Sequence, residues 1–170
     1  MEDTKVTVTF EGNPLTLTGE TPKLGEPAPD FEVLGNDLSA VKLSGLRGKT
    51  CVICSVPSLD TPVCDTEVRK FNESATSLGD DVAVLAISMD LPFAQGRWCG
   101  AAGVNNVQTL SDHRDAEFGN GYGVLIQELR LLARAVFVVD KDGVIRYIEV
   151  VDELTNEPDY EAALEAVREL

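Results

Sequence analysis

Hydrophobic residues fall into short continuous runs, separated by stretches in which they recur with helical spacing. The runs over 51–56, 82–88 and 135–139 predict strands that are buried on both faces of a sheet. Between the first two runs, apolar side chains three or four residues apart predict an amphipathic helix over 64–78, with Gly79 at the usual capping position. This alternation of strands and helices indicates an α/β fold.

The remaining patterns predict the elements at the two ends of the chain. Alternating polar and apolar residues around a turn predict an N-terminal β-hairpin extension over 1–19, with strands at 6–10 and 15–18. The other expected elements are a strand at 31–34, a helix from Pro92 towards Cys99, a short strand at 107–110, a short helix at 116–122, a strand at 144–151 antiparallel to 135–139, and a last helix after Pro158. The sheet is therefore expected to be mixed. Because no repeat or long linker follows residue 30, we expect residues 1–170 to form a single domain.

Composition and charge narrow the possible partners and the compartment. Of the 170 residues, 44% are hydrophobic, which is enough for a packed core. With 29 acidic against 14 basic residues, the net charge of -15 would repel phosphate backbones and anionic lipids, so neither nucleic acid nor a membrane is an expected partner. The apolar runs are too short to cross a bilayer, and the N-terminus lacks the apolar core of a secretion signal. We expect a cytoplasmic location.

Four cysteines in such a chain are more often catalytic, metal-binding or buried than paired in permanent disulfides. Cys64 has the most informative position, because it lies in the first turn of the predicted helix, on the same inward-facing stripe as Val68. The free N–H groups of a helix N-terminus stabilise an anion and so favour the reactive thiolate. Such a thiolate could attack a peroxide to give a sulfenic acid, which condenses with a second thiol, and Cys99 is a candidate for that thiol.

Three further residues fit this chemistry. The Thr61 hydroxyl, three residues before Cys64, could bond the sulfur, hold an oxygen of the substrate, or cap the helix. Pro57 could narrow access to the sulfur without adding a competing donor, since proline has no N–H. Arg134 stands at the head of a buried strand, where its charge requires an anionic partner or an exit to water, and a thiolate could be that partner.

The other candidate ligands and thiols have simpler interpretations. Cys51 and Cys54 form a C-x-x-C sequence inside a predicted strand, so their side chains should point to opposite faces rather than share a redox or zinc site. The single histidine, His113, is interpreted as a solvated loop residue.

Several motifs together resemble the thiol peroxidases, an atypical two-cysteine branch of the peroxiredoxins. They are EGNP at 11–14, the segment from Pro57 to Cys64, VRKFN at 68–72, SMDLPFAQ at 88–95, RWCG at 97–100, LARAV at 132–136 and EPDY at 157–160. The resemblance implies a thioredoxin-like sandwich, in which helices flank a central mixed sheet. It also implies that Cys64 is the peroxidatic cysteine and Cys99 the resolving cysteine. The rest of the implied active site is Pro57, Thr61 and Arg134.

The resemblance further implies a peroxidase that serves in antioxidant defence and redox homeostasis. Its expected substrates are hydrogen peroxide and alkyl hydroperoxides, its expected reductant is thioredoxin, and its expected assembly is a homodimer with no metal or organic cofactor. Two other function classes stay open at this point. One is a dithiol oxidoreductase or redox sensor that passes its disulfide to a protein partner. The other is a structural module that binds zinc through the four cysteines.

Overall fold

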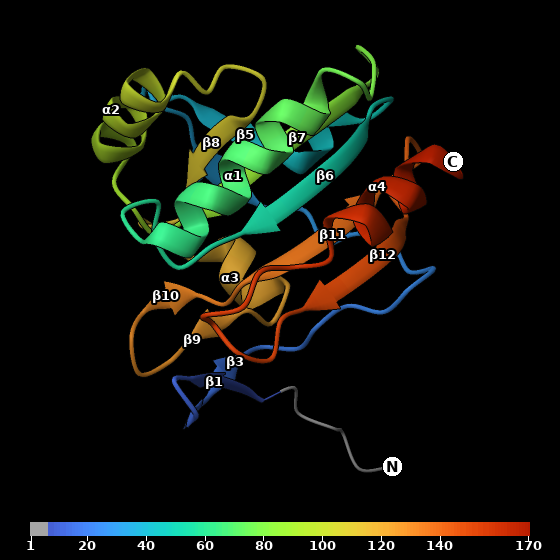
Figure 1. The fold of residues 1–170 in the computed structure, drawn as a ribbon. Helices are drawn as coiled ribbons and strands as arrows, with labels where there is room; N and C mark the ends of the chain where they lie inside the picture. Colours follow the sequence, from blue (N-terminus) through green and yellow to red (C-terminus); the bar gives the residue numbers. More distant parts are fainter. Residues whose placement is uncertain (1–6) are drawn as a thin grey trace.

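The computed structural model describes residues 7–170, and its centre is a seven-stranded sheet (Figure 1). In spatial order its strands are β12 (Ile145–Val150), β11 (Ala135–Val139), β6 (Thr50–Ser55), β7 (Val82–Ser88), β8 (Gln108–Ser111), β4 (Glu32–Leu34) and β5 (Ala40–Lys42). β6, β7 and β8 run parallel to one another, whereas the strands on either side pair antiparallel. Every residue of β6 is buried, as its continuous apolar run predicts. The expectation of a mixed sheet is confirmed.

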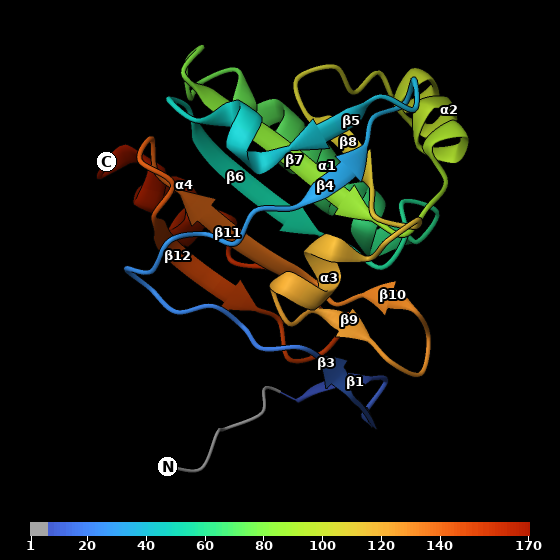
Figure 2. The same ribbon diagram turned by 180° about the vertical axis from the view of Figure 1, so that it is seen from behind.

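Helices cover both faces of this sheet. On one face lie α1 (Pro62–Ala75) and α4 (Tyr160–Arg168), with α2 (Pro92–Ala102) towards β8, and on the other face lies α3 (Glu117–Gly121) (Figures 1 and 2). A 3-10 turn, η1 (Leu43–Leu46), follows β5. Within residues 7–170, no helix is long and apolar enough to cross a membrane.

The sheet separates two hydrophobic clusters. Under α3, the aromatic rings of Phe118 and Tyr122 stack with a centroid distance of 4.6 Å. Cys51 belongs to this cluster, whereas Cys54 belongs to the cluster under α1 and α4, together with Cys64. The prediction that the two β6 cysteines point to opposite faces is therefore confirmed.

The N-terminal segment is divided between two small sheets. β1 (Val8–Phe10) pairs with β2 (Asn13–Leu15), whereas β3 (Leu17–Thr18) pairs with β9 (Leu125–Ile126), which also pairs with β10 (Leu131–Leu132). A hairpin is present, but the predicted strand at 15–18 is split between these two sheets. The predicted first strand included Val6, which lies outside the described residues.

Helix α1 differs at both ends from the predicted span of 64–78. It begins at Pro62, because the fixed φ of proline suits the first turn of a helix. It ends at Ala75, since the Thr76 and Ser77 hydroxyls bond carbonyl oxygens of the preceding turn and compete with the helical pattern. Gly79, with φ of 93°, lies in the turn before β7 instead of capping the helix.

Strand β1 supports the loop that follows β12. The Thr9 N–H donates to the Asp152 carbonyl at 2.8 Å, and the Leu154 N–H donates to the Thr9 carbonyl at 2.9 Å. The Glu153 carboxylate accepts bonds from the Thr9 hydroxyl at 3.0 Å and the Gly12 N–H at 2.9 Å. These contacts fix the position of the Leu154 carbonyl, which faces the candidate site.

The hydrogen bonds to the Glu153 carboxylate should make the stability of the fold depend on pH. Hydrogen bonds from the Thr155 hydroxyl and N–H, and then from Gly12 and Thr9, lower the pKa of Glu153 from 4.5 to about 2. A carboxyl whose folded pKa lies below its unfolded value stabilises the fold above pH 4.5 and loses that contribution as the pH falls towards 2. We expect Glu153→Gln to lower the melting temperature at neutral pH, by an amount that shrinks over that acid range.

Thermal unfolding of the parent and Glu153→Gln at a series of pH values checks this expectation. Glu169→Gln, at an exposed carboxyl beside the C-terminus, is the matched control and should follow the parent at every pH. A melting-temperature difference that stays constant from neutral pH down to pH 2 would contradict it.

Candidate active site

Cys64 lies in the first turn of α1, on the face that packs against the sheet. Its side chain is completely buried, in the same cluster as Val68 and Phe71. Thr61 is the N-cap residue, so the sulfur lies close to the free N–H groups at the helix N-terminus. The structure places Cys64 at the end of a helix and facing the core, as its spacing from Val68 predicts.

Arg134 reaches the sulfur from the segment that leads into β11. Its side chain is only 2% exposed, and Nη1 donates to Cys64 Sγ at 3.3 Å and to Glu67 Oε2 at 2.8 Å. Nε and Nη2 both donate to the Leu154 carbonyl, at 3.2 and 2.7 Å. Since the guanidinium is planar, these two bonds fix the direction in which Nη1 points. The anionic partner that the sequence required for Arg134 is therefore a pair of groups, a thiol and a carboxyl.

Glu67 is a site residue that the sequence analysis missed. It lies one helical turn after Cys64, on the same buried face, and its side chain has no exposed surface. Burial raises the pKa of Glu67 to about 7, although the nearby charge of Arg134 acts in the opposite direction. Its Oε1 atom is buried without a hydrogen-bond partner. A glutamate three residues after a candidate nucleophile, on an inward stripe, was the signal that could have revealed it.

Arg134 keeps its positive charge in this buried site. Burial lowers the pKa of the guanidinium, but the electrostatic interactions and hydrogen bonds with Cys64 and Glu67 outweigh that effect and raise the pKa overall. The site therefore holds a permanent cation against the sulfur.

The loop between β6 and α1 holds the other two predicted residues. Pro57 is buried directly after the strand, and the preceding Val56 N–H donates to the Ile87 carbonyl at 3.0 Å. The Thr61 hydroxyl donates to the Ser58 carbonyl at 2.9 Å, and its side chain makes no capping bond to the helix. Of the roles considered for Thr61, capping is thus not the one that the structure shows.

Asp90 anchors the same loop from the end of β7 and was also missed by the sequence analysis. Its carboxylate accepts bonds from the Ser58 hydroxyl at 2.7 Å, the Leu59 N–H at 2.8 Å and the Ser88 hydroxyl at 2.7 Å. No local pattern indicates this role, because the loop residues that it binds lie more than 30 positions earlier in the chain.

Cys99 lies on α2 and is half-buried. Its Sγ is 3.2 Å from the hydroxyl of Thr109, which in turn donates to Asn36 at 3.1 Å. Both Cys64 and Cys99 are free thiols in the structure. Their helices are joined next to the two cysteines, where Trp98 Nε1 donates to the carboxylate of Asp65 at 2.9 Å.

Cys51 and Cys54 lie in surroundings that keep their thiols neutral. Burial raises the pKa of Cys51 to about 11 and that of Cys54 well above its ordinary value. Because these two thiols face opposite sides of the sheet, the four cysteines do not converge on one point. Over the described range 7–170, no cluster of three or more histidine, cysteine, aspartate or glutamate side chains could hold a metal ion.

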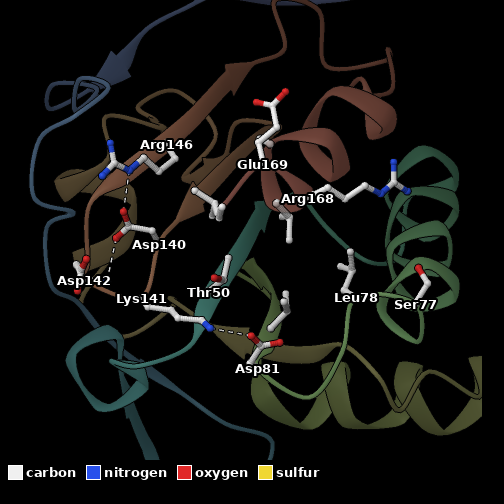
Figure 3. Close-up of a pocket in the computed structure, with 14 residues that line it drawn as sticks. Thr50, Ser77, Leu78, Asp81, Asp140, Lys141, Asp142, Arg146, Arg168 and Glu169 are labelled. Carbon is white, nitrogen blue, oxygen red and sulfur yellow. Dashed lines mark hydrogen bonds and ion pairs between the residues drawn. The ribbon is translucent and has the colours of Figure 1, made fainter.

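A surface cavity of about 760 Å³ lies at the other end of the sheet (Figure 3). It is lined by Thr50 and Val82, the first residues of β6 and β7, whereas Cys64 lies on α1, which the chain reaches from the last residue of β6. Two of its cations are already paired, since Lys141 contacts Asp81 at 2.9 Å and Arg146 contacts Asp140 at 2.7 Å (Figure 3). This cavity includes none of the predicted site residues.

Comparison with known proteins agrees with this arrangement. The Redoxin family matches residues 23–164 of the chain. The thiol peroxidase of Halalkalibacterium halodurans is 57% identical over 161 residues, which cover 95% of this chain and 96% of the relative. The thiol peroxidase of Bacillus subtilis is 55% identical over 163 residues, covering 96% and 97% of the two chains.

Solved structures show the same architecture. A peroxiredoxin-like protein from Aquifex aeolicus superposes with a TM-score of 0.91 at 44% identity, covering 96% of each chain. A thiol peroxidase from Chromobacterium violaceum shares the fold, with a TM-score of 0.86 at 21% identity over 99% of this chain and 97% of the other. The fold is thus a thioredoxin-like sandwich of the peroxiredoxin type, as expected. The chain belongs to the Redoxin family and, within it, to the thiol peroxidases.

The anchoring role of Asp90 leads to a specific expectation. Asp90→Ala removes two hydrogen bonds from the loop before α1 and one from Ser88 at the end of β7, so the free energy of unfolding should fall by about 2 kcal/mol. If this loop positions peroxide at Cys64, hydrogen peroxide should oxidise Cys64 at least about tenfold more slowly in Asp90→Ala. Denaturant unfolding and stopped-flow oxidation measure the two effects.

Asp37→Ala is the matched control, because Asp37 accepts bonds from Ser39 in an exposed turn. It should leave the oxidation rate of Cys64 unchanged. If Asp90→Ala oxidised Cys64 as fast as this control, the loop anchor would have no role in the reaction.

Proposed function

We propose that this chain reduces hydrogen peroxide and alkyl hydroperoxides through a cycle in which Cys64 is oxidised and Cys99 resolves the product. Membership of the thiol peroxidases makes the chain a thiol-dependent peroxidase of the peroxiredoxin type, and the proposal concerns its residues, substrates and reductant. The observation that carries it is the bond from Arg134 Nη1 to the buried sulfur of Cys64.

In the first step the thiolate of Cys64 attacks one oxygen of the peroxide. The S–O bond forms as the O–O bond breaks, giving a sulfenic acid and a hydroxide or alkoxide that takes up a proton. Negative charge moves from the sulfur to the departing oxygen, so a fixed cation beside the sulfur stabilises the transition state. The two bonds to the Leu154 carbonyl hold Arg134 in place beforehand, which avoids reorganisation during the reaction.

In the second step the thiol of Cys99 attacks the sulfur of the sulfenic acid, and water leaves as the disulfide forms. The two sulfurs must come within about 2.05 Å of each other. In the structure, one is buried against Arg134 and the other contacts Thr109. The first turn of α1 therefore has to open before the disulfide can form, and the bond between Asp65 and Trp98 opposes that opening.

The remaining parts of the proposal follow the family resemblance. Thioredoxin reduces the disulfide between Cys64 and Cys99, the chain acts as a homodimer in the cytoplasm, and its role is antioxidant defence. A fast reaction with peroxide separates this function from a redox sensor, which can react slowly.

Turnover of hydrogen peroxide with thioredoxin and its reductase tests the cycle. Cys64→Ser should abolish peroxide consumption, whereas Cys99→Ser should complete one oxidation and stop at the sulfenic acid. Cys51→Ala, which changes a buried thiol on the opposite face of the sheet, should keep the parent rate. Peroxide consumption by Cys64→Ser at the parent rate would disprove the proposal.

The contact between α1 and α2 gives a second expectation. Asp65→Ala removes the acceptor of the hydrogen bond from Trp98 Nε1. The loss of such a bond costs about 1 kcal/mol, which shifts the equilibrium for opening the first turn of α1 about fivefold towards the open state. Disulfide formation should therefore accelerate about fivefold, while sulfenic acid formation keeps its rate. Rapid quenching and mass spectrometry resolve the two steps, with Trp98 fluorescence as an optical signal.

Glu73→Gln, at an exposed position on the same helix, is the control and should leave both steps unchanged. An unaltered rate of disulfide formation in Asp65→Ala would show that this contact does not limit the opening.

A further inference from the structure

We infer that Glu67 and Cys64 share a single proton across Arg134, so that Glu67 is a neutral acid while Cys64 is a thiolate and becomes a carboxylate when Cys64 is oxidised. This inference rests on the proposed function and adds a proton partner to its first step. No contact between Glu67 and the peroxide is assigned. Glu67 affects the charge on Cys64 through the guanidinium that contacts both groups, so it is a positioning residue.

The geometry places one cation between two potential anions. Nη1 of Arg134 lies 3.3 Å from Cys64 Sγ and 2.8 Å from Glu67 Oε2. The two acidic side chains have no exposed surface, and the guanidinium is only 2% exposed. If both acidic groups ionised, one negative charge would be buried without compensation, which is strongly unfavourable in a water-poor interior. The charge balance around Arg134 therefore favours one proton held between the two groups.

The surroundings decide which group holds that proton. The thiolate of Cys64 has Arg134 on one side and the free N–H groups of the α1 N-terminus on the other. Glu67 lies one turn further along and has an oxygen, Oε1, that is buried without a partner. An unpartnered oxygen is less costly on a neutral acid than on a carboxylate. The raised pKa of Glu67, about 7, agrees with this assignment.

Four other titratable groups face Glu67, and the two carboxyls among them oppose a second negative charge. They are the thiol of Cys54 on β6, the carboxyls of Glu149 on β12 and Glu157 before α4, and the phenol of Tyr160 on α4. The two carboxyls raise the pKa of Glu67 further. Lys70, a cation in this region, is paired with Glu157 at 3.1 Å. Arg134 is thus the cation that contacts Glu67 directly.

The shared proton balances the oxidation step. The thiolate attacks the peroxide, and the departing hydroxide or alkoxide requires one proton to become water or an alcohol. Because Glu67 loses one proton in the same turnover, the net products are the sulfenic acid, water or alcohol, and the Glu67 carboxylate, with no net proton taken from solvent. The negative charge passes from Cys64 to Glu67, so the charge around Arg134 is the same before and after the reaction. When the disulfide is later reduced, the proton of the regenerated Cys64 thiol returns to Glu67.

Proton stoichiometry in a single turnover tests the inference. The experiment uses the full chain with Cys99→Ser, so that oxidation stops at the sulfenic acid, in weakly buffered solution near pH 7 with a pH indicator. The ultraviolet absorbance of the thiolate verifies that Cys64 is ionised beforehand, and mass spectrometry counts the sulfenic acid formed. We expect close to zero protons taken up from solvent per sulfenic acid. With Glu67→Gln added, the amide has no proton to give, and uptake should rise to close to one.

Glu73→Gln in the same background is the matched control and should stay close to zero. Uptake of one proton per sulfenic acid while Glu67 is present, or no thiolate absorbance before peroxide is added, would overturn the inference and leave the peroxidase function intact. A failure to form any sulfenic acid would overturn the proposed function itself.

A second measurement does not depend on the folding of Glu67→Gln. The infrared difference spectrum of the Cys99→Ser protein should lose the carbonyl band of a protonated carboxyl when peroxide is added. A spectrum without that loss would also overturn the inference.

Discussion

The guanidinium of Arg134 places a full positive charge in the interior of the protein, where it is 2% exposed. Such a charge costs several kcal/mol in lost hydration unless each of its N–H groups finds a partner. Here the partners are the Leu154 carbonyl, the Glu67 carboxyl and the sulfur of Cys64. The reactive sulfur is thus one of the groups that compensate a buried cation. In the proposed function, the same contact also favours the thiolate that would attack peroxide.

Three parts of the chain have to meet for this arrangement to exist. The first two turns of α1 supply Cys64 and Glu67, the residue before β11 is Arg134, and the loop after β12 supplies the Leu154 carbonyl. That loop is held by β1, because Thr9 forms backbone hydrogen bonds to it in both directions. The N-terminal hairpin, which lies outside the main sheet, therefore contributes to the position of the Arg134 guanidinium.

The sequence alone predicted the strands that have continuous apolar runs and the orientation of residues that have a clear helical spacing. The buried runs predicted β7 and β11 with their observed bounds, and the spacing from Val68 predicted the inward orientation of Cys64. β9 and β10 were missed because two residues are too few for a pattern. Glu67 was missed because a glutamate inside an amphipathic helix usually faces solvent, and here only the tertiary contact with Arg134 accounts for its burial.

In the proposed function, Arg134 stabilises the transition state of the peroxide reaction as well as the thiolate. The most direct test compares the rates at which Cys64 reacts with hydrogen peroxide and with iodoacetamide, which needs a thiolate but has no O–O bond to break. Arg134→Lys keeps the charge but loses the planar fork, with Arg130→Lys at an exposed turn as its control. In Arg134→Lys we expect a much larger loss of rate with peroxide than with iodoacetamide. Equal losses with both reagents would contradict it.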